Sequence, residues 1–262
     1  TYRQVKGYSI KSVSSDPSNI KEGQIWYNSS AKAIKVVPTV TAWASGGNLN
    51  TGRINAGSAS SGPRDASLYF AGETGPDNTM QTNESYDGSS WTELGDLNTG
   101  RRNVAGFGTQ TAAVCAGGLI PPANPQTQDL VEEWDGSSWT EVTDVPVAGI
   151  PVAMSAGTLT AGLIFGGENA AGDAQAAETY EYDGTNWTDG GDLNTARSDG
   201  GGAGTLTATL AFGGKEPAIS NKTEEYNGTS WTAANNTNNA TVDMGSGGIQ
   251  TNAIMVGGSN PP

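Results

Sequence analysis

Residues 86–102 read YDGSSWTELGDLNTGRR, and closely related phrases recur along the chain. The pattern of an aromatic residue, an Asp-Gly or Asn-Gly step and a tryptophan also begins at residues 134, 182 and 226. Tryptophans stand at 43, 91, 139, 187 and 231, so the successive intervals are 48, 48, 48 and 44 residues. A fixed period of this length predicts an array of similar structural units.

Each unit carries the signals of four β-strands. The Asp-Gly step favours a tight hairpin because glycine adopts the positive φ that the turn needs, so the aromatic residue and the tryptophan pair across two strands. Apolar runs such as GLIFGG (162–167) are typical of a strand buried on both faces. Small-residue segments such as DGGGAG (199–204) suit strands that crowd around an axis. The units therefore predict propeller blades.

The repeat predicts an all-β fold, a β-propeller of about five four-stranded blades with an N-terminal extended arm and hairpin. Each apolar run ends in a small doublet, found at 71–72, 117–118, 166–167, 213–214 and 257–258. A glycine doublet followed by a spaced aromatic residue and tryptophan resembles the kelch repeat, and this resemblance covers residues 43–258. A solenoid is the alternative architecture.

The fifth unit contains sequence for its first two strands but lacks the third and fourth strands that the other units have after the doublet. We expect N-terminal residues to complete it, with QIWYN (24–28) as the third strand and Trp43 in the fourth, because pairing the ends removes exposed sheet edges. Kelch propellers commonly have six or seven blades, so a truncated or continuing array is the alternative.

Charge divides the chain into two parts. Residues 1–35 carry a net charge of +4 and the remainder carries -18, within a total of -14. We therefore predict an N-terminal arm and hairpin at 1–38, used for particle attachment and ring closure, and a propeller at 39–262. The stretch DPSNIKEGQIWYNSSAKAIKV (16–36) resembles a short module of bacteriophage tail fibres and other virion proteins, particularly of marine phages.

The phage resemblance implies where the protein acts and what it contacts. The N-terminal part would attach to other virion proteins, and the distal part would face outward from the particle. The protein would be made in the host cytoplasm and exposed on the virion. Fibre proteins are often trimeric, so a homo-oligomer is an open alternative. The attachment residues expected in the arm are Tyr2, Arg3, Lys6, Tyr8 and Lys11.

Composition excludes several kinds of chemistry. The chain has no histidine, which removes imidazole bases and histidine-ligated metals, and its one cysteine, Cys115, is expected to be a small buried hydrophobe. The acidic charge argues against nucleic-acid binding. No run of 18 apolar residues is present, so no membrane insertion is expected. We expect no cofactor and no metal, although calcium bound by oxygen ligands is an alternative.

Two groups of residues are candidates for ligand binding at one end of the propeller. Loops that vary between units on a constant scaffold are a usual place for recognition, and arginine offers a planar fork of donors for an anion or sugar. The alternative for each arginine is a structural one, in which it satisfies carbonyls or a carboxylate of a neighbouring blade. The candidates are Arg53, Arg101, Arg102, Arg197, Asp77, Asn78, Asn124, Asn169 and Lys215.

These observations favour a non-enzymatic virion protein. Our first hypothesis is a tail fibre or appendage that binds a host-surface glycan or protein through the propeller loops. A capsid decoration or cement protein without a specific ligand is the second hypothesis. A glycan-degrading enzyme is the third, and it would need two carboxylates at a defined separation across one cleft.

Overall fold

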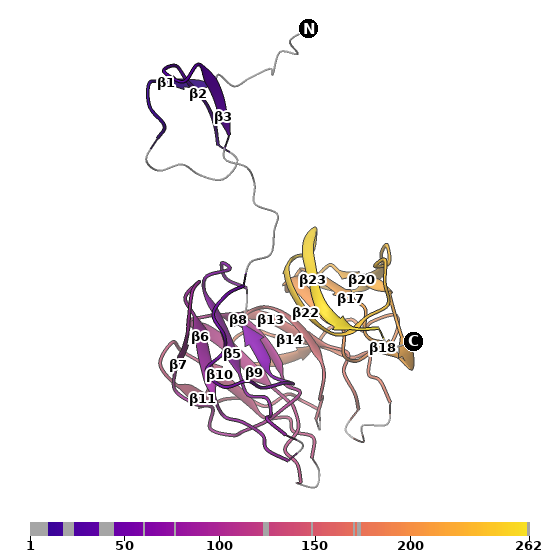
Figure 1. Cartoon of the computed structure of the whole chain (residues 1–262). Helices are drawn as coiled ribbons and strands as arrows, with labels where there is room; N and C mark the ends of the chain where they lie inside the picture. The colour runs from indigo at the N-terminus through magenta and orange to yellow at the C-terminus, as the bar shows by residue number, and fades with distance from the viewer. Residues whose placement is uncertain are drawn as a thin grey trace. The chain divides into compact units, whose positions relative to one another are not determined.

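The computed structural model describes residues 10–17, 24–36, 45–59, 61–75, 77–122, 126–147, 149–169, 171 and 174–260. These residues form two compact units, within Thr1–Ser45 and Gly46–Pro262. The secondary structure of the described residues is entirely β (Figure 1). They include no helix that is long and apolar enough to span a membrane.

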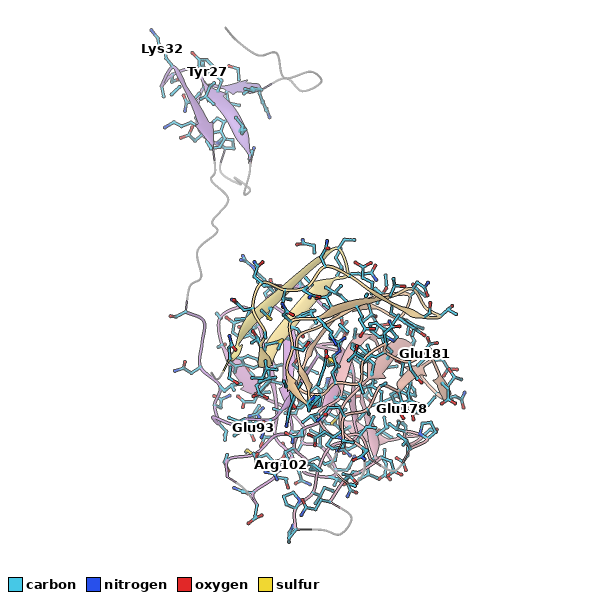
Figure 2. The ribbon with its side chains drawn as sticks, turned by 90° about the vertical axis from the view of Figure 1, so that its right-hand side faces the viewer. Tyr27, Lys32, Glu93, Arg102, Glu178 and Glu181 are labelled. Carbon is cyan, nitrogen blue, oxygen red and sulfur yellow. The ribbon has the colours of Figure 1, made fainter. Side chains whose placement is uncertain are left out.

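The N-terminal unit is a three-stranded sheet of β1 (Lys11–Val13), β2 (Ile25–Asn28) and β3 (Ala33–Val36). The predicted hairpin is confirmed, because β2 pairs antiparallel with β3, and Tyr27 and Lys32 mark this hairpin in Figure 2. On its other edge β2 pairs parallel with β1. With both edges occupied, β2 is not the third strand of the last blade, and the prediction that residues 24–28 complete that blade is wrong.

One carboxylate organises the N-terminal sheet. Asp16 accepts hydrogen bonds from the Asn28 amide at 2.7 Å and from the buried Trp26 indole N–H at 2.9 Å. These two bonds lower the pKa of the Asp16 carboxyl, the Asn28 bond having the larger effect. Asp16 thus links the segment after β1 to the side chains of Trp26 and Asn28 on β2.

The second unit consists of successive antiparallel sheets that keep their strands in chain order. Blade 1 comprises β4 (Gly57–Ala59), β5 (Ser67–Phe70), β6 (Asn83–Tyr86) and β7 (Trp91–Glu93). Blade 2 comprises β8 (Ala105–Thr109), β9 (Ala112–Ala116), β10 (Val131–Trp134) and β11 (Trp139–Glu141). Blade 3 comprises β12 (Met154–Thr158), β13 (Ala161–Phe165), β14 (Thr179–Tyr182) and β15 (Trp187–Asp189).

Blade 4 carries an additional small hairpin, and blade 5 has two long strands in the described residues where the other blades have four. Blade 4 comprises β16 (Gly201–Thr205), β17 (Ala208–Phe212), β20 (Thr223–Tyr226) and β21 (Trp231–Ala233). Between β17 and β20 lies the hairpin of β18 (Lys215–Glu216) and β19 (Ala218–Ile219). In the described residues, blade 5 comprises β22 (Val242–Ile249) and β23 (Asn252–Ser259).

The first strand of each blade lies nearest the axis. Strands β4, β8, β12, β16 and β22 pack against one another in this order, and all five contribute to a central cavity of about 90 Å³. Small residues line it, as predicted, and Ser155 Oγ donates a hydrogen bond across it to the Gly106 carbonyl at 2.7 Å. The predicted β-propeller of about five blades is confirmed.

Apolar side chains fill the space between complete blades in three clusters, one for each consecutive pair. The predicted cross-strand aromatic pairs are present, with ring centroids 5.0 Å apart for Tyr86 and Trp91 and 4.9 Å apart for Tyr226 and Trp231. The tryptophans of blades 2, 3 and 4 also contact a phenylalanine of the preceding blade, in the pairs Trp139–Phe70, Trp187–Phe107 and Trp231–Phe165. The repeated hairpin therefore supplies both the fold of a blade and its contact with the preceding blade.

Candidate functional site

Three of the predicted arginines are buried in ion pairs. Each arginine lies in the segment that leads into a blade and pairs with a glutamate on the third strand of that blade. The pairs are Arg53–Glu84 at 2.5 Å, Arg101–Glu132 at 3.4 Å and Arg197–Glu224. Their guanidinium groups also donate to buried carbonyls, as Arg53 does to the Tyr69 carbonyl at 2.7 Å.

The same glutamates also hold the segment that precedes each arginine. Glu84 accepts hydrogen bonds from the backbone N–H of Asn50 at 2.8 Å and from its side-chain amide at 3.0 Å. Asn98 and Asn194 make the same pair of bonds to Glu132 and Glu224. One carboxylate thus fastens a connecting segment to the following blade in three of the units.

The third unit lacks this cluster as a whole. At the three equivalent positions it has Pro146 for asparagine, Gly149 for arginine and Tyr180 for glutamate. A buried charge without its partner is costly, so loss of one member favours loss of the others. The three glutamates could have been identified from the sequence, because Glu84, Glu132 and Glu224 all stand seven positions before a tryptophan.

The ion pairs correct the prediction that Arg53, Arg101 and Arg197 bind a ligand. Their charged groups are enclosed by protein and paired with carboxylates and carbonyls, which is the structural alternative stated above. Among the described residues, Nε of Arg53 and both Nε and Nη1 of Arg101 have no hydrogen-bond partner. Burial alone would raise the pKa of the Glu84 carboxyl, but hydrogen bonds from Arg53 and from the backbone of Asn50 outweigh it and lower that pKa. The three Asn–Arg–Glu clusters fasten blades 1, 2 and 4 to the segments that lead into them.

The two groups of loops do lie at one end of the propeller. The residue after each doublet pairs with the segment after the arginine phrase, as Glu73 does with Ile54 and Leu119 with Arg102. Nearby, residues with positive φ connect successive blades through their backbones. Asn103 N–H donates to the Asn55 carbonyl at 2.8 Å, and the ladder continues through Val152, Asp199 and Asp243.

A cavity of about 420 Å³ opens at this end beside blade 1. Glu73 forms its polar wall and accepts from Arg102 at 2.5 Å and from the Asn55 amide at 2.6 Å. Ile54 forms an apolar wall and is 64% exposed. Unlike the other arginines, Arg102 keeps about a fifth of its side chain accessible, and Figure 2 places it at the lower end of the propeller.

A short loop borders this cavity through Thr74. Asn78 donates from its amide to Thr74 Oγ1 at 2.6 Å, and Asp77 is exposed beside it. Of the candidate residues, Arg102 lines the cavity, and the loop of Asp77 and Asn78 lies beside it through the bond to Thr74. Ile54, Glu73 and Thr74 were not predicted, because no repeated pattern singles them out.

The other candidate residues lie elsewhere or outside the description. Asn169 and Lys215 are exposed in the loops of blades 3 and 4, and Lys11 is exposed in β1. Burial raises the pKa of the Asp199 carboxyl near Lys215. The expected residues outside the described ranges are Asn124, Tyr2, Arg3, Lys6 and Tyr8.

The chemistry of the cavity is that of binding by hydrogen bonds and apolar contact. Cys115 is buried, and its desolvation raises the pKa of the thiol although Arg101 opposes the shift. Within the described ranges, no group of three or more cysteine, aspartate or glutamate side chains is arranged to hold a metal ion. The cavity is lined by one carboxylate, that of Glu73, by exposed Ile54 and by two arginines, of which Arg102 is accessible and Arg53 has its side chain enclosed.

No family model matches the chain, and no curated protein matches it in sequence. Among solved structures, that of YjhT is similar, with a TM-score of 0.63 and 12% sequence identity over 79% of this chain and 77% of that chain. At this level of identity the likeness concerns the fold. The chain folds as a β-propeller.

Proposed function

We propose that this protein is a non-enzymatic structural protein of a bacteriophage virion, a tail fibre or appendage that binds a host-surface glycan or protein through its propeller loops. The repeats are of the kelch type in this proposal. The observation that carries it is that recurring and variable residues occupy different places in each unit. The residues that recur between units are buried within and between blades, whereas the residues that differ between units lie in exposed loops at one end.

The cavity beside blade 1 supports a carbohydrate as the ligand. Sugars offer hydroxyl groups to forked donors and acceptors and an apolar ring face to an aliphatic side chain. Arg102 and Glu73 supply the polar groups, and Ile54 supplies an exposed apolar surface. The pair is already neutralised internally, which suits an uncharged ligand better than a strongly anionic one.

Binding to a glycan array and to host cells tests this proposal. The variant Arg102→Ala should weaken binding at least about tenfold without loss of fold, and Thr160→Ala should bind as the unchanged protein does. Thr160 is the matched control because it is exposed in the β12–β13 turn, remote from the cavity. Absence of binding to any glycan or host cell would contradict the proposal.

The same preparation separates the other two hypotheses. Release of reducing sugar that is abolished by changing one loop carboxylate would favour a glycan-degrading enzyme. Loss of particle integrity on deletion of the protein, without any glycan binding, would favour a capsid cement protein. Antibody labelling of intact particles locates the protein on the tail or the head.

The attachment role proposed for the N-terminal arm has its own test. Removal of residues 1–23 should abolish incorporation into particles, while the circular dichroism and thermal transition of the propeller stay unchanged. The propeller is a separate compact unit that begins at Gly46, so its fold does not require the arm. Continued incorporation of the shortened protein would refute attachment through these residues.

A further inference from the structure

The N-terminal sheet has one covered face and one exposed face. Side chains alternate along β2, so that Trp26 and Asn28 are buried while Ile25 is 50% exposed and Tyr27 is 36% exposed. Asp16 lies against the covered face, where it accepts hydrogen bonds from Trp26 and Asn28. In the described part of this unit, the opposite face is therefore open at two large apolar side chains of the central strand.

The strand pairing identifies the other members of the exposed face. Tyr27 pairs with Ile34 on β3 and with Ser12 on β1, and residues paired across strands lie on the same face of a sheet. Ile34 is 64% exposed, and Ile10, directly before β1, is 50% exposed. We call the surface of Ser12, Ile25, Tyr27 and Ile34 the bare face. It is apolar apart from two hydroxyl groups, and large exposed apolar patches mark sites of interaction.

The charged side chains of this unit lie away from the bare face. Among its described residues they are Lys11, Asp16, Lys32 and Lys35. Lys11 and Lys35 both pair with Trp26, which places them on the covered face, and Lys32 lies in the turn between β2 and β3 (Figure 2). A partner that brought a charged side chain to the bare face would bury that charge without a counter-charge, which is costly. The bare face therefore suits an uncharged apolar surface.

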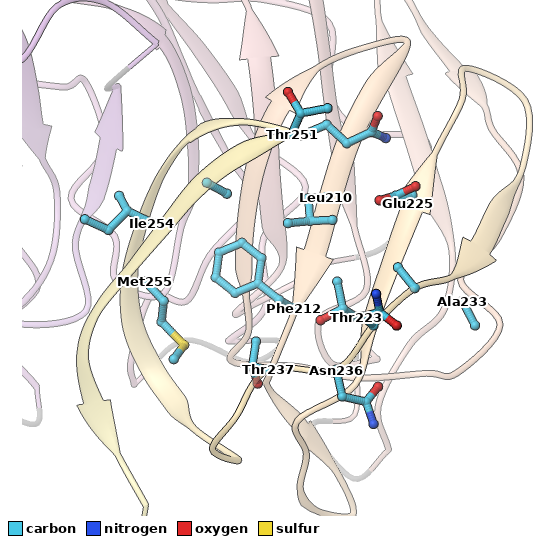
Figure 3. A pocket seen from close by; sticks show the side chains of 14 residues that line it. Leu210, Phe212, Thr223, Glu225, Ala233, Asn236, Thr237, Thr251, Ile254 and Met255 are labelled. Carbon is cyan, nitrogen blue, oxygen red and sulfur yellow. The ribbon is translucent and has the colours of Figure 1, made fainter. Parts of the chain in front are cut away.

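The propeller exposes a second apolar surface, which serves as a comparison. A groove of about 830 Å³ lies between β23 and blade 4, and Ile254, which is 47% exposed on β23, lines it (Figure 3). The exposed carboxylate of Glu225 also lines this groove. The groove thus carries a charge of the kind that the bare face lacks.

We propose that the bare face packs against the bare face of a second copy of the chain, with the two sheets about 10 Å apart as in a β-sandwich. A sheet with an apolar face has to bury that face against another layer. A second copy supplies an identical uncharged face and leaves Lys11 and Lys35 of both copies on the outside. The positive charge of the unit therefore does not oppose the contact. This inference does not depend on the proposed function.

The position of Tyr27 fixes the symmetry of the contact. In a two-fold interface the same surface is used by both copies. Tyr27 lies on the central strand, so a two-fold axis near it brings the two Tyr27 rings together and places Ile25 and Ile34 around them.

The size of the bare face sets the expected strength of the contact. Its strands are about 4.8 Å apart and rise about 3.3 Å per residue, so the three short strands cover about 14 by 13 Å. A standard interface buries about 800 Å² on each partner, which is more than this face offers. We therefore expect a weak dimer, with a dissociation constant between about 10 μM and 1 mM.

Sedimentation equilibrium of the full chain tests the proposal. The average mass should rise toward that of two copies as the concentration approaches about 1 mM. Ile34→Ser should weaken the association at least about tenfold, because it removes a buried isoleucine from both copies. Ile254→Ser is the matched control, since it removes an exposed isoleucine from the propeller and should leave the association unchanged. Both side chains are exposed, so the thermal transition should stay the same.

Crosslinking locates the contact on the sheet. The one cysteine of the chain, Cys115, is buried, so an introduced cysteine supplies the reactive thiol. Ser12→Cys lies on the bare face and should be joined to its copy by a short bismaleimide, and adding Ile34→Ser should lower the yield severalfold. Lys11→Cys is the matched control, because Lys11 is the preceding exposed residue of β1 and belongs to the covered face.

Three results would overturn the proposal. The first is a full chain that stays monomeric at about 1 mM. The second is association that is unaffected by Ile34→Ser but lost in Ile254→Ser, or equal crosslinking through positions 11 and 12, because either result would place the contact elsewhere. The third is a Ser12→Cys thiol that reacts slowly with a maleimide at every dilution, which would mean that another segment of the same chain covers the bare face.

Discussion

Replacing Glu84 by glutamine should destabilise the propeller by about 3 kcal/mol, at the low end of the range for breaking a buried ion pair. The carboxylate accepts from Arg53 at 2.5 Å and from the Asn50 backbone at 2.8 Å, and both side chains of the ion pair are fully enclosed. Glutamine keeps one acceptor oxygen but leaves the guanidinium without a countercharge. The residual bond from Arg53 to the Tyr69 carbonyl limits the loss.

Urea unfolding followed by tryptophan fluorescence measures this cost. A loss of about 3 kcal/mol lowers the midpoint by roughly 1–2 M urea for typical denaturant slopes. Glu93→Gln is the matched control, because Glu93 lies directly opposite Glu84 on the neighbouring strand and is exposed (Figure 2). Arg53→Met combined with Glu84→Gln should cost less than the sum of the single changes.

The pH dependence supplies a second readout. The folded-state pKa of Glu84 is lowered from 4.5, so its contribution is fully present above that value and is lost as the pH falls through the folded pKa. The difference in unfolding free energy between the unchanged protein and Glu84→Gln should therefore be largest at neutral pH and shrink below about pH 4. Equal costs for Glu84→Gln and Glu93→Gln, or a difference that does not depend on pH, would refute the reasoning.

Three further outcomes follow from the core. Gly162→Ala should cost about 1–3 kcal/mol in unfolding free energy, because a methyl group there would lie 2.1 Å from the Phe107 ring, whereas Gly247→Ala, with nothing within 4 Å, should be nearly neutral. The Cys115 thiol should react with a thiol reagent only after unfolding, and rapid labelling of the native protein would contradict its burial. Burial and a carboxylate acceptor raise the pKa of Tyr226 to about 12, so Tyr226→Phe should remove an absorbance change that occurs well above pH 10 and lower the stability below that pH.

The blades could be predicted from the sequence because their signals are local and repeated. An Asp-Gly turn and two aromatic residues specify a hairpin, and four copies at one period specify an array. The pairing of β2 with β1 could not be predicted in this way, because Lys11–Val13 is too short to show alternation and the pairing is parallel. Whether such a short strand forms, and with which neighbour it pairs, depends on its tertiary contacts.

The candidate site was predicted only in part, for a similar reason. Arg53, Arg101 and Arg197 were selected because they recur at one position of the repeat. In this chain that recurrence reflects a structural role in buried ion pairs. Arg102 has a different environment because it stands one position after a recurring arginine. Sites of recognition depend on residues that differ between units, and one sequence gives no pattern from which to select them.

The backbone ladder at the loop end shows how successive blades are linked around the axis. Asn55, Asn103, Val152, Asp199 and Asp243 all have positive φ, and each donates its N–H to the carbonyl of the residue before it in this series, starting from Asn103. Among the described residues no such bond joins Asn55 to Asp243, which would close the ring. Within the described residues the ladder thus links blades 1 to 5 in chain order, and β23 pairs only with β22.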